Sequence, residues 1–174
     1  MSRQSQPPKR NITLIGMPGA GKSTLGVVLA KMLNMQFLDA DLFIQTIHGK
    51  TLQQLIDEFG AEGFIAIENE ALQNIDAENT VIATGGSAIY SPDAIERLAA
   101  TGLAVYLEIS YDELVTRLGD LDERGVVMTR EINTLRELYD ERRPLYERAA
   151  TVTVNVNALT ITEAARKVVK AIST

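Results

Sequence analysis

Residues 12–23 read Ile-Thr-Leu-Ile-Gly-Met-Pro-Gly-Ala-Gly-Lys-Ser, a short apolar strand followed by a full match to G-x-x-x-x-G-K-[ST]. The glycines let the backbone curl so that its N–H groups point at a phosphate, while the lysine reaches the β/γ oxygens and the serine faces Mg²⁺. A helix that begins here adds its positive N-terminal end. The stretch favours a nucleotide site over an unliganded glycine-rich turn. The predicted nucleotide-binding residues are Gly16, Gly19, Ala20, Gly21, Lys22, Ser23 and Thr24.

The size and composition of the chain limit what it can be. Its 174 residues suit one domain, predicted over 11–174, after a flexible polar tail at 1–10. The absence of cysteine excludes disulfides, thiolate nucleophiles and Cys-ligated zinc. No apolar run approaches the length of a membrane span, and a net charge of −6 argues against general nucleic-acid binding. We therefore expect a cytoplasmic monomer without nucleic-acid or membrane partners.

Short apolar runs alternate with longer helical patterns along the chain. This order is typical of a mostly parallel sheet with helices on both faces. The sequence therefore predicts an α/β protein of the three-layer α/β/α type with five strands. The expected strands are Ile12–Ile15, Gln36–Leu38, Val81–Ala83, Leu103–Glu108 and Thr151–Val154.

Two acidic residues, Asp39 and Asp41, follow the apolar pair Phe37-Leu38 at the end of a predicted strand. Ligands of open α/β sheets bind outside the carboxyl ends of the strands, so both carboxylates are expected near the phosphate loop. One of them could face Mg²⁺ and the other the phosphate acceptor. The structural alternative is that Asp39 ends the strand and Asp41 caps the next helix.

A pair of glycines follows the predicted strand Val81–Ala83, in the sequence Thr84-Gly85-Gly86-Ser87. Paired glycines allow the backbone to approach a ligand closely, and their N–H groups could hold a substrate or a γ-phosphate. A plain turn is the alternative.

Arginine is the only basic residue type between residues 117 and 148. Arginine binds phosphates and carboxylates through two parallel hydrogen bonds, which suits a nucleotide enzyme, although most of these side chains can be a solvated helix face. Within this region, residues 119–130 mix acids with Gly125 and show no clear period. We predict a mobile lid there, whose closure would shield phosphoryl transfer from water.

Several landmarks occur in an order that resembles the shikimate kinases over residues 11–172. Besides the phosphate loop, they are Asp39-x-Asp41, Gly60-x-x-Gly63-Phe64, the helix with Glu68, Thr84-Gly85-Gly86, Val105-Tyr106-Leu107, Arg117-Leu118 and Arg142-x-Pro144-Leu145-Tyr146. The resemblance implies a P-loop kinase fold and an ATP-dependent, Mg²⁺-dependent kinase that phosphorylates a hydroxyl of a small metabolite.

The resemblance assigns roles to four residues on the nucleotide side and to Asp41, which would face the acceptor. Lys22 and Ser23 would hold the ATP phosphates and Mg²⁺, and Asp39 would orient the metal. Arg117 would pack on the adenine. Asp41 would accept a hydrogen bond from the acceptor hydroxyl and could take its proton.

On the acceptor side, the resemblance implies that Gly85 and Gly86 present backbone N–H groups to the acceptor. Arg142 would bind an anionic group of the acceptor, and Arg124 would move in with the lid as a catalytic residue. Phe64 could belong to the core or form a wall of the acceptor pocket.

The chain departs from the family pattern at Ile65, where shikimate kinases usually have an arginine that pairs with the substrate carboxylate. Shikimate is still the leading named acceptor. A different hydroxylated metabolite is one alternative, and a nucleotide-binding sensor without transfer activity is another. A nucleotide kinase or phosphate-loop hydrolase of related architecture also stays open.

Overall fold

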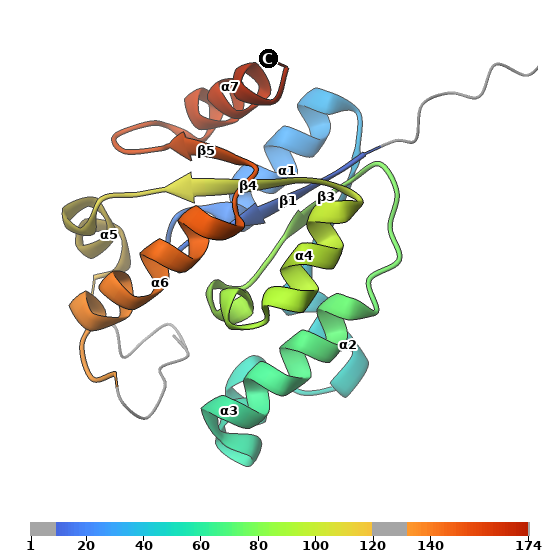
Figure 1. The fold of residues 1–174 in the computed structure, drawn as a ribbon, viewed down its shortest axis with the longest axis vertical. Helices are drawn as coiled ribbons and strands as arrows, with labels where there is room; N and C mark the ends of the chain where they lie inside the picture. The colour runs from blue at the N-terminus through green and yellow to red at the C-terminus, as the bar shows by residue number, and fades with distance from the viewer. Residues whose placement is uncertain (1–9, 120–131, 174) are drawn as a thin grey trace, which may run out of the picture.

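The computed structural model describes residues 10–119 and 132–173, which form five strands, seven α-helices and one 3₁₀ helix (Figure 1). The strands are β1 (Asn11–Ile15), β2 (Gln36–Asp39), β3 (Thr80–Ala83), β4 (Gly102–Glu108) and β5 (Val152–Asn155). The helices are α1 (Lys22–Leu33), α2 (Ala40–His48), α3 (Leu52–Gln73), η1 (Gly86–Tyr90, the 3₁₀ helix), α4 (Pro92–Ala100), α5 (Tyr111–Leu118), α6 (Leu135–Ala149) and α7 (Ile161–Ile172).

All five strands lie in one sheet in the order β2-β3-β1-β4-β5, and every pairing is parallel. The register places Leu14 of β1 opposite Ala83 of β3 and Val105 of β4. The carboxyl ends of β1, β2 and β3 therefore meet at one edge of the sheet, where the phosphate loop, Asp39 and Thr84 follow them.

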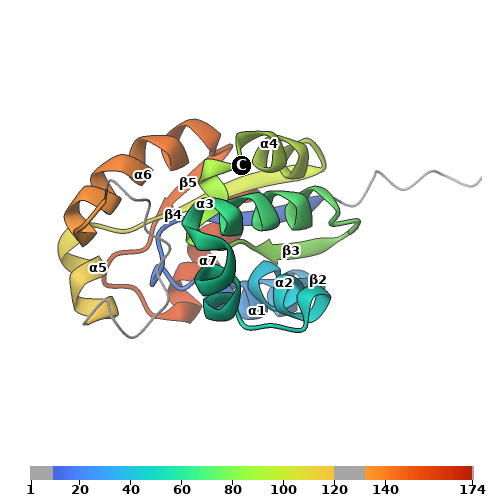
Figure 2. The same ribbon diagram turned by 90° about the horizontal axis from the view of Figure 1, so that it is seen from below.

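Helices cover both faces of the sheet, which makes three layers. Helices α1 and α7 pack together on one face, and α4 and α6 lie on the other (Figure 2). Because both faces are covered, β1 and β3 are buried along their whole length. The main hydrophobic core lies between these layers, and a second cluster around Ile44, Leu55 and Phe64 joins α2 to α3.

Local sequence signals account for several helix starts. Thr51 and Thr160 each accept a hydrogen bond from the backbone N–H three residues on, within complete capping boxes. Ser110 accepts from the N–H of Glu113 at the start of α5, while its own N–H donates to Asn157, and Pro92 lies in the first turn of α4. Helix α3 contains a kink at Gly60, and the segment after the kink carries residues that reach the site described below.

The predicted fold class is confirmed, and the five strands occur within one residue of the predicted bounds. The sheet is entirely parallel rather than mostly parallel. Most of the predicted lid, 120–130, and residues 1–9 of the predicted tail lie outside the described residues. Within the part of the chain that the structure describes, none of the helices combines the length and apolar character needed to cross a membrane.

Candidate active site

The phosphate loop connects β1 to α1 in a conformation that requires glycine. Gly16 has φ +148°, and a Cβ on this residue would lie 2.9 Å from the carbonyl oxygen of Leu107. Lys22 is 7% exposed, and its Nζ donates to the carbonyl oxygens of Gly16 and Met17 over 2.7 and 2.8 Å. The loop is thus closed around its own lysine, next to the exposed side chains of Ser23 and Thr24.

The electrostatics of the loop fit a bound polyphosphate with Mg²⁺. Burial lowers the pKa of Lys22 to about 8, although the charge of Asp41 partly opposes this shift. A phosphate beside this ammonium group would supply the missing counter-charge. Mg²⁺ is usually held by one or two protein oxygens together with phosphates and water, so the loop needs no dedicated cluster of carboxylates. Among the described residues no such cluster of three or more ligands exists.

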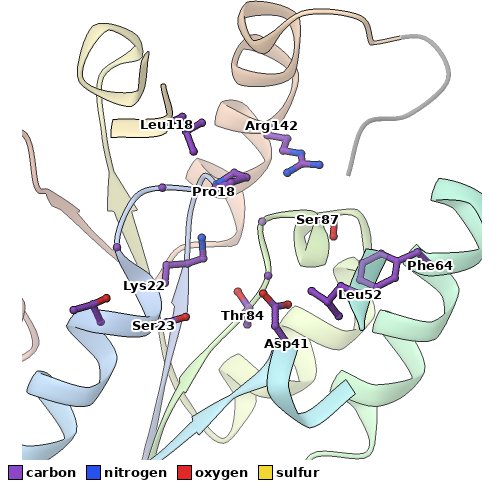
Figure 3. A pocket seen from close by; sticks show the side chains of 15 residues that line it. Pro18, Lys22, Ser23, Asp41, Leu52, Phe64, Thr84, Ser87, Leu118 and Arg142 are labelled. Carbon is purple, nitrogen blue, oxygen red and sulfur yellow. The ribbon is translucent and has the colours of Figure 1, made fainter. Parts of the chain in front are cut away.

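A cavity of about 360 Å³ opens next to the loop (Figure 3). It extends from the phosphate loop to α3, η1 and α6, so it has a phosphate side and an acceptor side. Its lining residues are Pro18, Gly19, Gly21, Lys22, Ser23, Thr24, Asp41, Leu52, Phe64, Thr84, Gly85, Gly86, Ser87, Leu118 and Arg142.

The two predicted aspartates have different positions. Asp41 lines the cavity, and burial together with the charge of Asp39 raises its pKa. Asp39 is instead the N-cap of α2, where its Oδ1 accepts from the N–H groups of Asp41 and Leu42 over 2.9 and 3.2 Å. The helix cap is therefore Asp39, not Asp41 as in the structural alternative. Asp39 is absent from the cavity lining, and its role toward Mg²⁺ remains a prediction.

The paired glycines lie where the backbone passes close to charged side chains. A Cβ on Gly85 would come within 2.5 Å of Glu68 Oε1 and 2.9 Å of Asp41 Oδ1. A Cβ on Gly86 would lie 2.8 Å from Pro18 and 3.0 Å from Arg142 Nη1. Both residues line the cavity, so a larger side chain at either position would displace its polar groups.

Arg142 reaches the cavity from α6 and is completely buried (0% exposed). Its Nε donates to the Tyr90 hydroxyl over 3.2 Å, and its guanidinium lies 5.0 Å from the centre of the Tyr90 ring. Tyr146, from the same helix, donates to the carbonyl oxygen of Gly86 over 2.6 Å. These contacts fix the guanidinium opposite Ser87 and Phe64 (Figure 3).

Glu68 and Ser87 form a part of the site that local sequence patterns did not identify. The Ser87 hydroxyl donates to Glu68 Oε2 over 2.5 Å, and Glu68 is fully buried behind Gly85. Burial raises the pKa of Glu68 to about 7, and the bond from Ser87 opposes that shift. Besides the resemblance, which includes the helix with Glu68 as a landmark, the available signal was a single acidic residue between Phe64 and Leu72 on an otherwise apolar helix face.

The other predicted site residues differ in where they lie relative to the cavity. Phe64 is both core and cavity wall. Arg117 contacts Glu113 over 2.9 Å and the carbonyl oxygen of Val156 over 3.1 Å, outside the cavity lining. Ile65 borders a separate, smaller cavity beside Tyr90. The predicted catalytic residue Arg124 lies outside the described residues.

A glycine loop with a buried lysine, an aspartate in the first turn of the helix after the next strand, and a cavity beyond them define a P-loop kinase of small molecules. Comparisons with known proteins give the family. A model of the family described as "Shikimate kinase" matches residues 18–173. The shikimate kinase of Vibrio parahaemolyticus is 38% identical over 166 residues, which cover 93% of this chain and 95% of that protein. The chain belongs to the shikimate kinase family.

Solved structures agree with this family. A shikimate kinase from Acinetobacter baumannii, solved in complex with shikimate, superposes with a TM-score of 0.85 and 32% identity, covering 95% of this chain and 93% of that one. The Aquifex aeolicus shikimate kinase gives 0.81 with 29% identity, over 94% and 96% of the two chains. A Sinorhizobium meliloti gluconokinase shares the fold alone, at 0.58 and 19% identity over 97% and 94%. The chain is thus a phosphotransferase with an alcohol acceptor that uses ATP with Mg²⁺.

Proposed function

We propose that this protein transfers the γ-phosphoryl group of ATP to a hydroxyl of a small hydroxylated metabolite held between Asp41 and Arg142, with shikimate as the leading acceptor. The observation that carries the proposal is that Lys22, Asp41 and Arg142 line one cavity although they come from α1, α2 and α6. The protein would act as a cytoplasmic monomer.

Enzymes catalyse phosphoryl transfer mainly by positioning the reactants and stabilising charge, and the residues of this cavity can supply both. ATP with Mg²⁺, when bound, supplies the phosphoryl group and the leaving group. Ser23, with Asp39 behind it, would hold the metal. Asp41 would hold the acceptor hydroxyl and take its proton as the oxygen bonds to phosphorus, and its raised pKa favours this proton transfer.

Further assignments follow the same proposal. The loop glycines and Thr24 would bind the phosphates through backbone groups, and Arg117 would pack on the adenine. Gly85 and Gly86 would present N–H groups to the acceptor. Arg124 would reach the transferring group from the segment after α5.

The acceptor side limits which molecules can bind. Lys22 and Arg142 are the cations that line the cavity among the described residues, and Lys22 belongs to the phosphate loop. Arg142 therefore supports an acceptor with a single anionic group. Ile65 is apolar and lines the separate cavity beside Tyr90, so the position of the usual arginine adds no cation on the acceptor side. Shikimate, a monocarboxylate with three hydroxyl groups, meets these requirements, and other hydroxylated monoacids of similar size do so as well.

A coupled assay of ADP release tests the proposal over shikimate, other hydroxylated acids, polyols, amino alcohols and nucleoside monophosphates. We expect shikimate or another hydroxylated monoacid to give the highest kcat/KM. Lys22→Ala should lower kcat at least about a hundredfold, because it removes a charge that stabilises the transferring group. ATP binding without turnover of any acceptor would instead support a sensor, and turnover of nucleoside monophosphates alone would indicate a nucleotide kinase.

A further inference from the structure

The hydrogen bond between Ser87 and Glu68 determines what Ser87 can offer to a ligand. A serine hydroxyl has one proton and two acceptor lone pairs. Here the proton is donated to Glu68 Oε2 over 2.5 Å, a length typical of a hydroxyl bound to a charged carboxylate. Since the Ser87 side chain also lines the cavity, it presents lone pairs there, not a proton.

The surroundings of Glu68 favour acceptance of the Ser87 proton. Its other oxygen, Oε1, has no hydrogen-bond partner among the described residues, so Ser87 is the donor to this carboxyl group within them. The charged groups that act on Glu68 are Asp41 from α2, Arg142 from α6 and Lys22 from α1. With a pKa of about 7, the carboxyl group is mostly ionised at pH 8, where it accepts the serine proton.

Ser87 directly follows the residue that lies beside the cation of the acceptor side. The adjacent residue, Gly86, has its Cβ position 3.0 Å from Arg142 Nη1. The remaining acceptor-side wall includes the apolar side chains of Leu52 and Phe64 (Figure 3). A molecule whose anionic group meets Arg142 would therefore bring its neighbouring substituent to Ser87.

We propose that Ser87 is a specificity-determining residue, oriented by Glu68, which accepts a hydrogen bond from a hydroxyl group of the acceptor. The site then takes a small hydroxylated monoanion, with its anionic group on Arg142 and a hydroxyl donor on Ser87. Glu68 acts through Ser87 as a positioning residue. This inference rests on the proposed function, because it assumes that the acceptor lies between Asp41 and Arg142.

The test compares two probes that differ only in their donors: shikimate, and cyclohex-1-ene-1-carboxylate, which has the same ring and carboxylate without hydroxyl groups. Affinities are measured by ligand-observed NMR at pH 8 on the full chain and its Ser87→Ala and Ser87→Gly variants. Both variants should bind shikimate about three- to tenfold more weakly, as expected for one lost hydrogen bond, and bind the unhydroxylated acid as before. Ser91→Ala is the control, because Ser91 is another buried serine but lies outside the cavity lining.

The role of Glu68 is tested by the pH dependence of the two probe affinities. Below pH 7 a protonated Glu68 can donate to Ser87, whose proton is then free to face the cavity. The ratio of the affinity for shikimate to the affinity for the unhydroxylated acid should therefore change between pH 6 and 8 in the wild type. The same ratio should stay constant in Glu68→Gln. A purely structural role would leave the ratio unchanged while weakening both probes.

Equal shikimate affinity in wild type and Ser87→Ala, equal loss of both probes, or no shikimate binding by any form would overturn the role of Ser87. The proposed function is judged separately by ADP release. A kinase that turns over another acceptor while Ser87→Ala has no effect on shikimate therefore contradicts the inference alone.

Discussion

On the phosphate side of the cavity the ligand groups come from one contiguous loop, residues 16–24, whereas on the acceptor side they are side chains brought together from distant elements. Lys22 is six residues from the carbonyl oxygen it contacts at Gly16, but Ser87 is nineteen residues from Glu68. Arg142 is fifty-two residues from Tyr90. The first arrangement is local and depends on backbone shape. The second depends on tertiary packing, and can change its ligand preference one side chain at a time.

Asp41 lines the cavity between the two sides. Its substitution is expected to give the largest change in kcat without a matching change in ATP binding. Asp41→Asn keeps the size of the side chain but cannot take the acceptor proton, and we expect kcat to fall about 10²- to 10⁴-fold with little change in the KM for ATP. ADP release measures both constants. Asp57→Asn, an exposed change on α3, is the control. A kcat within threefold of wild type would show that Asp41 only positions the acceptor.

The same contrast explains how far the sequence could predict this molecule. The loop, the strand before it and the placement of Asp41 follow from local patterns, because a strand end fixes where the next few residues lie. The sequence did not predict that Asp39 caps α2, since both aspartates fit an N-cap equally well by residue type. The hydrogen bond between Ser87 and Glu68 could not be predicted, because nothing in either local sequence specifies that α3 packs against η1.

Substitution of Arg142 tests whether the acceptor side binds an anionic group. Arg142→Lys keeps the charge but loses the planar fork that can bind a carboxylate through two hydrogen bonds. We expect the KM for the best acceptor of the panel to rise about 10- to 100-fold, and the KM for ATP to change less than threefold. Arg143→Lys is a matched control on the same helix, because Arg143 is half-exposed and pairs with Glu147. Equal effects of the two substitutions would contradict an anion-binding role for Arg142.

Substitution of Glu68 gives the smallest expected effect, a change in how the stability of the folded protein depends on pH. Burial raises the pKa of its carboxyl group from 4.5 to about 7, so between these pH values the folded protein binds this proton more tightly than the unfolded chain does. Stability should therefore fall as pH rises through this window, and the loss is complete above pH 7. Each pKa unit corresponds to about 1.4 kcal/mol, so the shift of the Glu68 pKa gives an upper limit of roughly 3–4 kcal/mol.

Glu68→Gln removes the charge and keeps the shape of the side chain, so it should recover part of that loss. We expect its melting temperature relative to wild type to rise by about 3–6 °C between pH 5 and pH 8, corresponding to about 1–2 kcal/mol. Scanning calorimetry at the two pH values measures this difference. Glu70→Gln, an exposed position on the same helix, corrects for the loss of a surface charge. If the Glu68→Gln difference is the same at both pH values, then Glu68 keeps an ordinary pKa in the folded protein, and the acceptor wall must hold its carboxylate with groups other than Ser87.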